Sequence, residues 1–263
     1  MKLFNNYNKI VLTVEYDGRN YFGFQWQADQ PTIQDELEKA IFRLTGEKNR
    51  ILAASRTDTG VHARGQVISF RTHSKLSPQV VVRALNYYLP DDIAIQGACI
   101  APDNFDVRRD ALSREYDYRI LNNTNRSPLM EGFIHVVIGK LNVENMNKAC
   151  QFLKGEHDFT SFASSLGGRK DTIRYVYVAE VTQEDKMVTF RIVASSFLPH
   201  QVRNTVGLLI RVGLGKVDPE ETGHIMEARI SGLAGPAAPP YGLYLTKVNY
   251  PADLELKYEN LCN

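Results

Sequence analysis

A net charge of +1 on 263 residues means that the chain is not basic over its whole surface, so any polyanion it binds must meet a local cluster of cations. Hydrophobic residues make up 43% and charged residues 23%, as in a soluble globular protein that buries a core as one large domain or two small ones. Three widely spaced cysteines fit neither a disulfide framework nor a zinc site, and no apolar run reaches membrane-spanning length. We therefore expect a cytoplasmic protein with no membrane partner.

The first half of the chain is predicted to run strand, helix, strand, strand, helix, strand. Apolar residues alternate from Lys9 to Tyr16, which is typical of a strand. Thr32 is a helix-start residue before an apolar stripe, and Ser77 begins a second helix in the same way. The predicted strands are residues 9–16, 51–55, 67–71 and 93–100.

The second half repeats this order. Asn142 is predicted to cap a helix, another helix runs from about Pro199 to about Arg211, and an extra one follows Asp218 with a capping box to Glu221. The predicted strands are residues 114–121, 173–181, 187–194 and 243–250. Two βαββαβ units indicate an α+β fold of two ferredoxin-like halves, residues 1–109 and 110–263, with antiparallel or mixed sheets that form one extended sheet and a central active-site cleft.

One loop places a carboxylate between an arginine and a glycine turn. Asp58 follows Arg56 and precedes Gly60, directly after the apolar residues 51–54. A carboxylate on a tight turn at a strand end is positioned and still reachable by a substrate. Taken alone the pattern is weak, because Asp, Thr and Gly are ordinary turn formers.

An aromatic strand follows a basic segment. Tyr116 and Tyr118 share one strand face, which suits core packing or, as a functional reading, stacking on a flipped base with a phenol that moves a proton. Arg108 and Arg109 could hold phosphates, and Arg169-Lys170 is a second candidate RNA contact. Residues 21–27 mix aromatics with amides and could be a core plug or a wall of the site.

Three polar residues on the later helix suggest a second group of site residues. His200, Arg203 and Asn204 have the i, i+3, i+4 spacing of one helix face. They could form a solvated face or a structural ion pair, or Arg203 could reach a carboxylate in a cleft and keep it ionised. No phosphate-binding glycine loop, dinucleotide motif or metal-ligand spacing is present, so we expect neither a cofactor nor a metal.

The sequence Arg-Thr-Asp-Thr-Gly-Val-His-Ala at residues 56–63 resembles the active-site signature of the TruA family of tRNA pseudouridine synthases. Similar segments follow in order at residues 15–18, 21–23, 33–38, 105–118, 155–162, 200–204 and 242–245. Their order and spacing together are highly specific. This chain departs from the family's usual pattern at Phe24, at Gln201 and at Asp106-Val107.

The resemblance implies an enzyme that isomerises uridine to pseudouridine: the N1 glycosidic bond breaks, the uracil rotates and C5 joins C1′. Asp58 would be the catalytic carboxylate, attacking the sugar, attacking the base or taking a 2′ proton. Arg203 would pair with Asp58, and Arg56 would displace the target base or hold it open. Tyr116 would stack on the uracil and accept the C5 proton, and Leu245 would line the uracil pocket.

His200 and Arg108 are further expected substrate contacts. The resemblance also implies a homodimer that acts on the tRNA anticodon stem-loop, at roughly positions 38–40, recognised more by shape than by sequence. Alternatives are an RNA-binding protein of the same fold without catalysis, a pseudouridine synthase acting on another RNA, and a glycoside hydrolase, which would need a second carboxylate that the sequence does not reveal.

Overall fold

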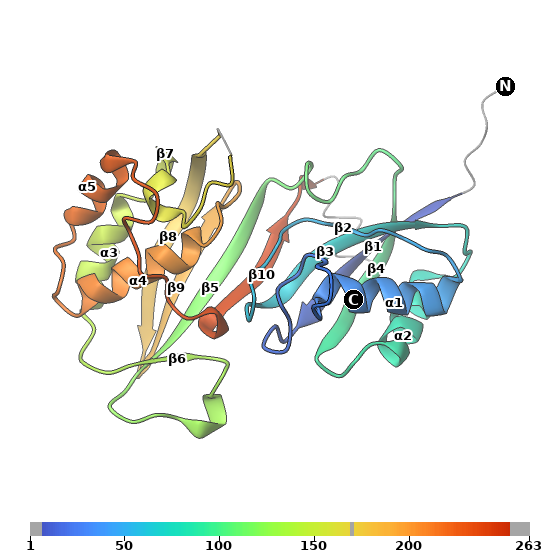
Figure 1. Ribbon diagram of the computed structural model, residues 1–263, viewed down its shortest axis with the longest axis horizontal. Coiled ribbons are helices and arrows are strands. Elements are labelled where there is room, and N and C mark those ends of the chain that lie inside the picture. The colour runs from blue at the N-terminus through green and yellow to red at the C-terminus, as the bar shows by residue number, and fades with distance from the viewer. Residues whose placement is uncertain (1–6, 169–170, 253–263) are drawn as a thin grey trace. The chain divides into compact units, whose positions relative to one another are not determined.

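The computed structural model describes residues 7–168 and 171–252, which form two compact units (Figure 1). The first unit runs to Leu112 and includes the chain again from Leu245, and the second is Ser113–Tyr244. The described residues contain ten strands and five α-helices, which confirms the predicted α+β class. The predicted division into residues 1–109 and 110–263 places the whole last strand in the second half, whereas the chain from Leu245 onward belongs to the first unit. The predicted central cleft concerns how the units are placed relative to each other and stays a prediction.

The sheet of the first unit has the order β4-β1-β3-β10. Strand β1 (Asn8–Tyr16) is antiparallel to both β3 (His62–Thr72) and β4 (Ile93–Ala101). Strand β10 (Leu243–Asn249) is the other neighbour of β3, which is why the end of the chain belongs to this unit. The short β2 (Leu52–Ala53) pairs with β3 off this path.

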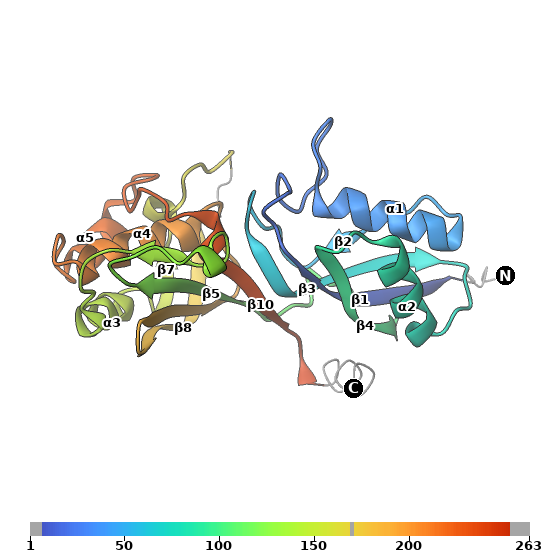
Figure 2. The ribbon, with the colours of Figure 1, turned by 90° about the horizontal axis from the view of Figure 1, so that it is seen from below.

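Two capped helices lie on one face of this sheet, α1 (Ile33–Thr45) and α2 (Pro78–Tyr88) (Figure 2). Both helices begin where the sequence predicts. The Thr32 hydroxyl accepts from the backbone N–H of Asp35, and the Ser77 hydroxyl accepts from that of Val80. Each such cap is worth about 1 kcal/mol. The face that α1 turns to the core comprises Ile33, Gln34, Leu37, Ala40 and Ile41.

The second unit has the strand order β5-β9-β8-β7. The strands are β5 (Ser113–Asn122), β6 (His135–Val137), β7 (Gly155–Asp158), β8 (Ile173–Glu184) and β9 (Met187–Ala194). Neighbours are antiparallel along β5, β9, β8 and β7, whereas β6 runs parallel to β5, so the sheet is mixed. The predicted hairpin at Asp185 joins β8 to β9. Strands β6 and β7 are additions to the predicted pattern.

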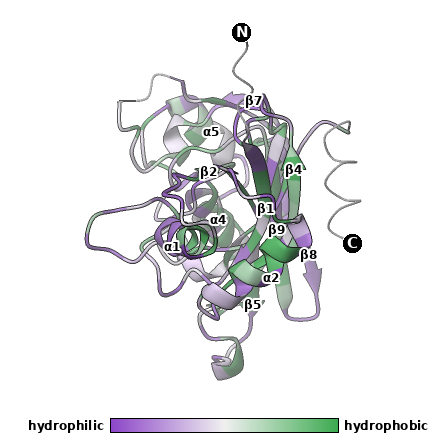
Figure 3. Ribbon diagram, turned by 90° about the vertical axis from the view of Figure 1, so that its right-hand side faces the viewer, coloured by the Kyte–Doolittle hydropathy of each residue, from purple (hydrophilic) through white to green (hydrophobic). Residues whose placement is uncertain are grey.

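Three helices complete the second unit, α3 (Val143–Gln151), α4 (Gln201–Gly213) and α5 (Glu221–Ala228). The predicted cap of α3 is present, since the Asn142 side chain accepts from Asn145 N. The core of this unit includes Phe159, Phe162, Phe190, Leu208 and Leu209. Figure 3 shows the hydropathy of the elements, with β4 of the first unit coloured largely as hydrophobic. No helix within residues 7–168 and 171–252 is long and apolar enough to cross a membrane.

Within the described part of the chain, three short 3-10 helices lie at Pro128–Met130, Thr160–Phe162 and Pro240–Gly242. Several predicted boundaries differ from the observed ones, and two of the differences concern how a strand or helix begins. Strand β3 begins at His62 and not at residue 67, because the motif's last residues already pair with β1. The capping box at Asp218 does not form: α5 begins at Glu221, and Asp218 contributes only its backbone carbonyl to a turn.

Candidate functional site

The loop that carries Asp58 leaves the sheet of the first unit at Ser55. The buried amide of Gln66 on β3 holds Ser55 on both sides: its Nε2 donates to the Ser55 carbonyl at 2.9 Å, and its Oε1 accepts from the Ser55 N–H at 3.3 Å. The loop then closes with a hydrogen bond from Val61 N to the Asp58 carbonyl at 3.1 Å. Arg56 is exposed and Asp58 is half-buried, so the carboxylate stays reachable from a loop whose backbone is held.

Thr57 anchors the loop to the core immediately before Asp58. Its side chain is buried, and its hydroxyl lies 2.8 Å from the hydroxyl of Tyr16 on β1. Its carbonyl accepts from the backbone N–H of Phe24 at 3.1 Å. These bonds connect Asp58 to a strand and to the segment after β1, both within the same unit.

Gly23 lies directly against this anchor. Its φ is +86°, and a Cβ placed on it would lie 2.8 Å from the Thr57 carbonyl oxygen and 3.2 Å from the Thr59 nitrogen. Beside it, Gly60 N donates to the Tyr21 carbonyl at 3.4 Å. Only glycine meets both the backbone conformation and the close approach without displacing the Asp58 loop.

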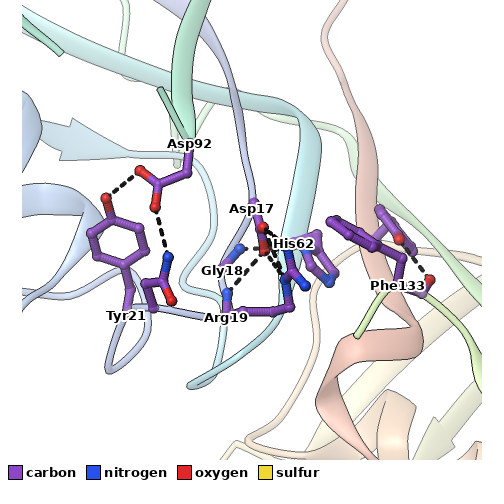
Figure 4. A network of polar contacts seen from close by, with 9 residues as sticks. Asp17, Gly18, Arg19, Tyr21, His62, Asp92 and Phe133 are labelled. Carbon is purple, nitrogen blue, oxygen red and sulfur yellow. Dashed lines mark hydrogen bonds and ion pairs between the residues drawn. The ribbon is translucent and has the colours of Figure 1, made fainter. Parts of the chain in front are cut away.

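A polar network supports the start of β3, as Figure 4 shows. His62 is buried; its Nδ1 lies 3.2 Å from an Asp17 carboxylate oxygen and 3.3 Å from the Gly18 nitrogen. Burial alone would raise the pKa of Asp17, but hydrogen bonds from Arg19 outweigh that cost and hold it below its usual value. A Cβ on Gly18 would lie 2.0 Å from the Val61 carbonyl oxygen, so this segment contacts the loop's far end.

Tyr21 is fixed by a second carboxylate in the same view (Figure 4). Its hydroxyl donates to Asp92 at 2.5 Å, and the Asn20 amide donates to the other Asp92 oxygen at 3.1 Å. Burial and the Asp92 carboxylate raise the pKa of Tyr21, which keeps the phenol a neutral donor. Asp92 therefore holds Tyr21, whose backbone carbonyl accepts the hydrogen bond from Gly60 N.

Tyr116 and Tyr118 lie on the same face of β5, as predicted, and both are buried. The ring of Tyr116 is 5% exposed and meets Phe197 edge to face at 5.1 Å between centroids. A base can stack on it only over that small area or after its neighbours move.

Tyr118 is structural: its hydroxyl donates to the Pro239 carbonyl at 2.9 Å and lies 3.2 Å from His135 Nδ1. Burial raises the pKa of Tyr118 and lowers the pKa of His135.

The predicted shared helix face at α4 does not form. His200 precedes the helix in a left-handed conformation, with φ at 59°, and Asn204 points into the core, where its amide donates to the Phe162 carbonyl at 2.7 Å. Arg203 is half-buried, and its Nε donates to the Ala238 carbonyl at 2.8 Å. Arg203 is thus held by the loop before β10.

Arg108 and Arg109 project from a tight turn at the end of the first unit. One carboxylate oxygen of Asp106 accepts from both of their backbone N–H groups at 2.9 Å, and both side chains are exposed. Buried Val107 anchors the turn, since its carbonyl accepts from Tyr250 at 2.6 Å. The second candidate RNA contact, Arg169-Lys170, lies outside the described residues.

The predicted site residues divide between the units. Asp58, Arg56, Arg108 and Leu245 belong to the first, and Tyr116, His200 and Arg203 to the second. The pairing of Asp58 with Arg203 therefore stays a prediction. Leu245 has no accessible surface, so it is a packed residue of β10. In the described part of the chain, no three His, Cys, Asp or Glu side chains form a group that could hold a metal ion.

The supporting side chains were not assigned roles from the sequence. Tyr16, Gln66, Asp17 and His62 together hold the Asp58 loop, although Tyr16 and Asp17 lie far from it in sequence. One signal was available: residues 15–18 and 62–63 belong to the segments that carry the family resemblance. Local patterns contain no information on contacts at such separations.

Comparison with known proteins gives a match to the family described as tRNA pseudouridine synthase, over residues 12–110 and 149–251. These ranges include every predicted site residue except Tyr116. The chain is 41% identical over 241 residues to tRNA pseudouridine synthase A of Thermoanaerobacter sp. (strain X514), covering 92% of this chain and 99% of the relative. It is 38% identical over 248 residues to the protein of that name from Shewanella sediminis, covering 94% and 95%.

Proposed function

Because the chain belongs to the tRNA pseudouridine synthase family, it is an enzyme that converts uridine to pseudouridine in tRNA, and we propose that its targets lie in the anticodon stem-loop, at roughly positions 38–40. The reaction is an isomerisation without net redox change or hydrolysis. The bond from N1 to C1′ breaks, C5 joins C1′, the C5 proton leaves and N1 gains a proton.

Asp58 is the carboxylate that acts on the substrate. The observation that supports this role is the construction of its loop, in which Gln66, Tyr16 and Phe24 hold the two residues Ser55 and Thr57 that precede Asp58, while the carboxylate stays half-buried. A carboxylate held in this way needs little reorganisation when it attacks the sugar or the base or takes the 2′ proton. Arg56, exposed two residues earlier, holds the flipped base open.

Tyr116 and Arg203 complete the site from the second unit. Arg203 is oriented by its hydrogen bond to the Ala238 carbonyl, and it pairs with Asp58 when the site is assembled. Tyr116 stacks on the uracil and accepts the C5 proton, with His200 as a further contact. Leu245, fully buried on β10, becomes a wall of the uracil pocket when neighbouring side chains move. Flipping a base costs a few kcal/mol, which phosphate contacts from Arg108 and its neighbours offset.

The enzyme works in the cytoplasm as a homodimer on one tRNA, without a cofactor. A dimer gives a mass near twice the chain's 29.8 kDa in light scattering. A monomer that is active on tRNA at micromolar concentration would contradict it.

Two unmodified tRNA transcripts test the proposed targets. One keeps its uridines at the proposed positions, and in the other these are replaced by cytidine. We expect pseudouridine in the first alone, located by chemical mapping. Pseudouridine in the second transcript would place the targets elsewhere, release of free uracil would indicate a glycoside hydrolase, and binding without any modification would indicate an RNA-binding protein.

A further inference from the structure

The segment that follows Phe24 presents the chain's one tryptophan to solvent. The Trp26 ring is 43% exposed, whereas Phe24, two residues earlier, is 2% exposed and fills the core. Tryptophan is highly buried on average, so an exposed one next to a buried aromatic has no evident packing role. The guanidinium carbon of Arg50 lies 5.2 Å from the centroid of the Trp26 ring.

A buried amide holds the backbone at Trp26. Gln34, at the start of α1 and only slightly exposed, accepts from the Trp26 N–H at 3.0 Å and from the Gln25 side chain at 2.9 Å. Its own Nε2 donates to Glu38 at 2.7 Å. Because these bonds already fix the backbone, the indole ring is not needed to close the segment against α1.

Arg50 joins this arrangement from the segment before β2. Its side chain is 65% exposed, and its Nη1 lies 3.2 Å from a Glu38 carboxylate oxygen. The result is a guanidinium that lies over an aromatic ring on an exposed surface. An indole ring provides a stacking surface for any base, and a guanidinium pairs with phosphate, so the pair suits one nucleotide of a single strand or loop.

The pair is connected to the Asp58 loop by one backbone hydrogen bond and two residues of chain. Phe24 N donates to the carbonyl of Thr57, the residue before Asp58, and Trp26 is two residues further on. Consecutive Cα atoms are about 3.8 Å apart, so the Cα of Trp26 lies within about 8 Å of that of Phe24. A strand whose uridine reaches Asp58 therefore has a neighbouring nucleotide within reach of the indole.

From this geometry we propose that Trp26 and Arg50 form a subsite for a nucleotide flanking the target uridine, with its base stacked on the indole and its phosphate on the guanidinium. This inference rests on the proposed function, because it takes tRNA as the ligand. It adds a contact on the first unit to those expected from Arg108 and the second unit. The subsite favours an unpaired flanking base, since a paired base has no free face to stack.

The single tryptophan permits a direct test in the unaltered protein. Wild-type protein is titrated with an unmodified tRNA transcript, the intrinsic fluorescence is corrected for absorbance by the RNA, and pseudouridine is measured in the same samples. Binding should change the Trp26 emission and protect it from quenching by acrylamide. Trp26→Ala should raise the Kd for tRNA by about 5- to 140-fold, the loss expected for one base–aromatic stack. Trp26→Phe should restore part of the affinity.

Tyr87→Ala is the matched control, since Tyr87 is an 83% exposed aromatic on α2 of the same unit and should leave the Kd unchanged. If pseudouridine forms while tRNA leaves the Trp26 fluorescence unchanged and Trp26→Ala binds tRNA with the wild-type Kd, the subsite is refuted and the proposed function stands. If tRNA binding changes the emission and no pseudouridine forms, the proposed function fails and the subsite stands. A Trp26→Ala protein that loses thermal stability but binds tRNA with the wild-type Kd would show that Trp26 only stabilises the fold. That result would overturn the inference.

Discussion

Replacing Gly23 by alanine tests whether the segment after β1 sets the position of Asp58. At a φ of +86° an L-residue costs roughly 1–2 kcal/mol. The new Cβ would lie 2.8 Å from the Thr57 carbonyl oxygen, well short of the 3.4 Å at which ordinary contacts begin, and the neighbouring atoms are backbone. The loop must therefore move by about half an ångström. Since a displacement of about 1 Å can cost a hundredfold in rate, we expect the rate to fall about tenfold.

The assay is single-turnover pseudouridine formation at saturating tRNA, with urea unfolding measured in parallel. Gly46→Ala is the matched control: Gly46 ends α1 at a φ of +72°, and a Cβ there meets nothing within 4 Å. It should lose about 1–2 kcal/mol of stability from the backbone cost and keep the full rate. A Gly23→Ala protein that is as fast as Gly46→Ala would refute the positioning role of this segment.

Three further predictions follow from the same contacts. Tyr118→Phe removes the hydrogen bond to Pro239 and should lower the free energy of unfolding by about 1 kcal/mol, measured by urea unfolding; an unchanged value would contradict its structural role. The pKa of Asp17 is held below its unfolded value of about 3.9, so its ionised form stabilises the protein above that pH; the stability advantage of wild type over Asp17→Asn should disappear as the pH falls through the folded pKa, and a difference that persists in strong acid would refute it. Arg108→Gln and Arg109→Gln should each reduce the slope of log affinity against log salt by about 1, and an unchanged slope would exclude them as phosphate contacts.

Local signals in the sequence were sufficient for the helix starts. Thr32 and Ser77 were predicted as helix starts, and in the structure both hydroxyls accept from an N–H three residues later. The same reasoning failed at Asp218, where a carboxylate and Glu221 have capping-box spacing but the chain makes a backbone turn first. A capping pattern shows only that a cap can form, and packing decides where the helix begins.

The candidate site was predictable only in part. The turn chemistry and the family resemblance located the Asp58 loop, whereas the contacts that fix it come from Gln66, Tyr16 and Gly23, which meet it through tertiary structure. The prediction that His200 shares a helix face with Arg203 and Asn204 was wrong, because His200 adopts a left-handed conformation before α4 begins. No periodicity reveals a single residue of that kind.

Turnover by an Asp58→Ala protein tests the central claim most directly. The half-buried carboxylate lies on a loop whose backbone is held by other residues, so the variant should unfold in urea as wild type does and bind tRNA with similar affinity. We predict that it forms no pseudouridine in tRNA even with enzyme in excess over RNA. Measurable pseudouridine formation by the pure, folded variant would contradict the assignment of Asp58 as the essential carboxylate.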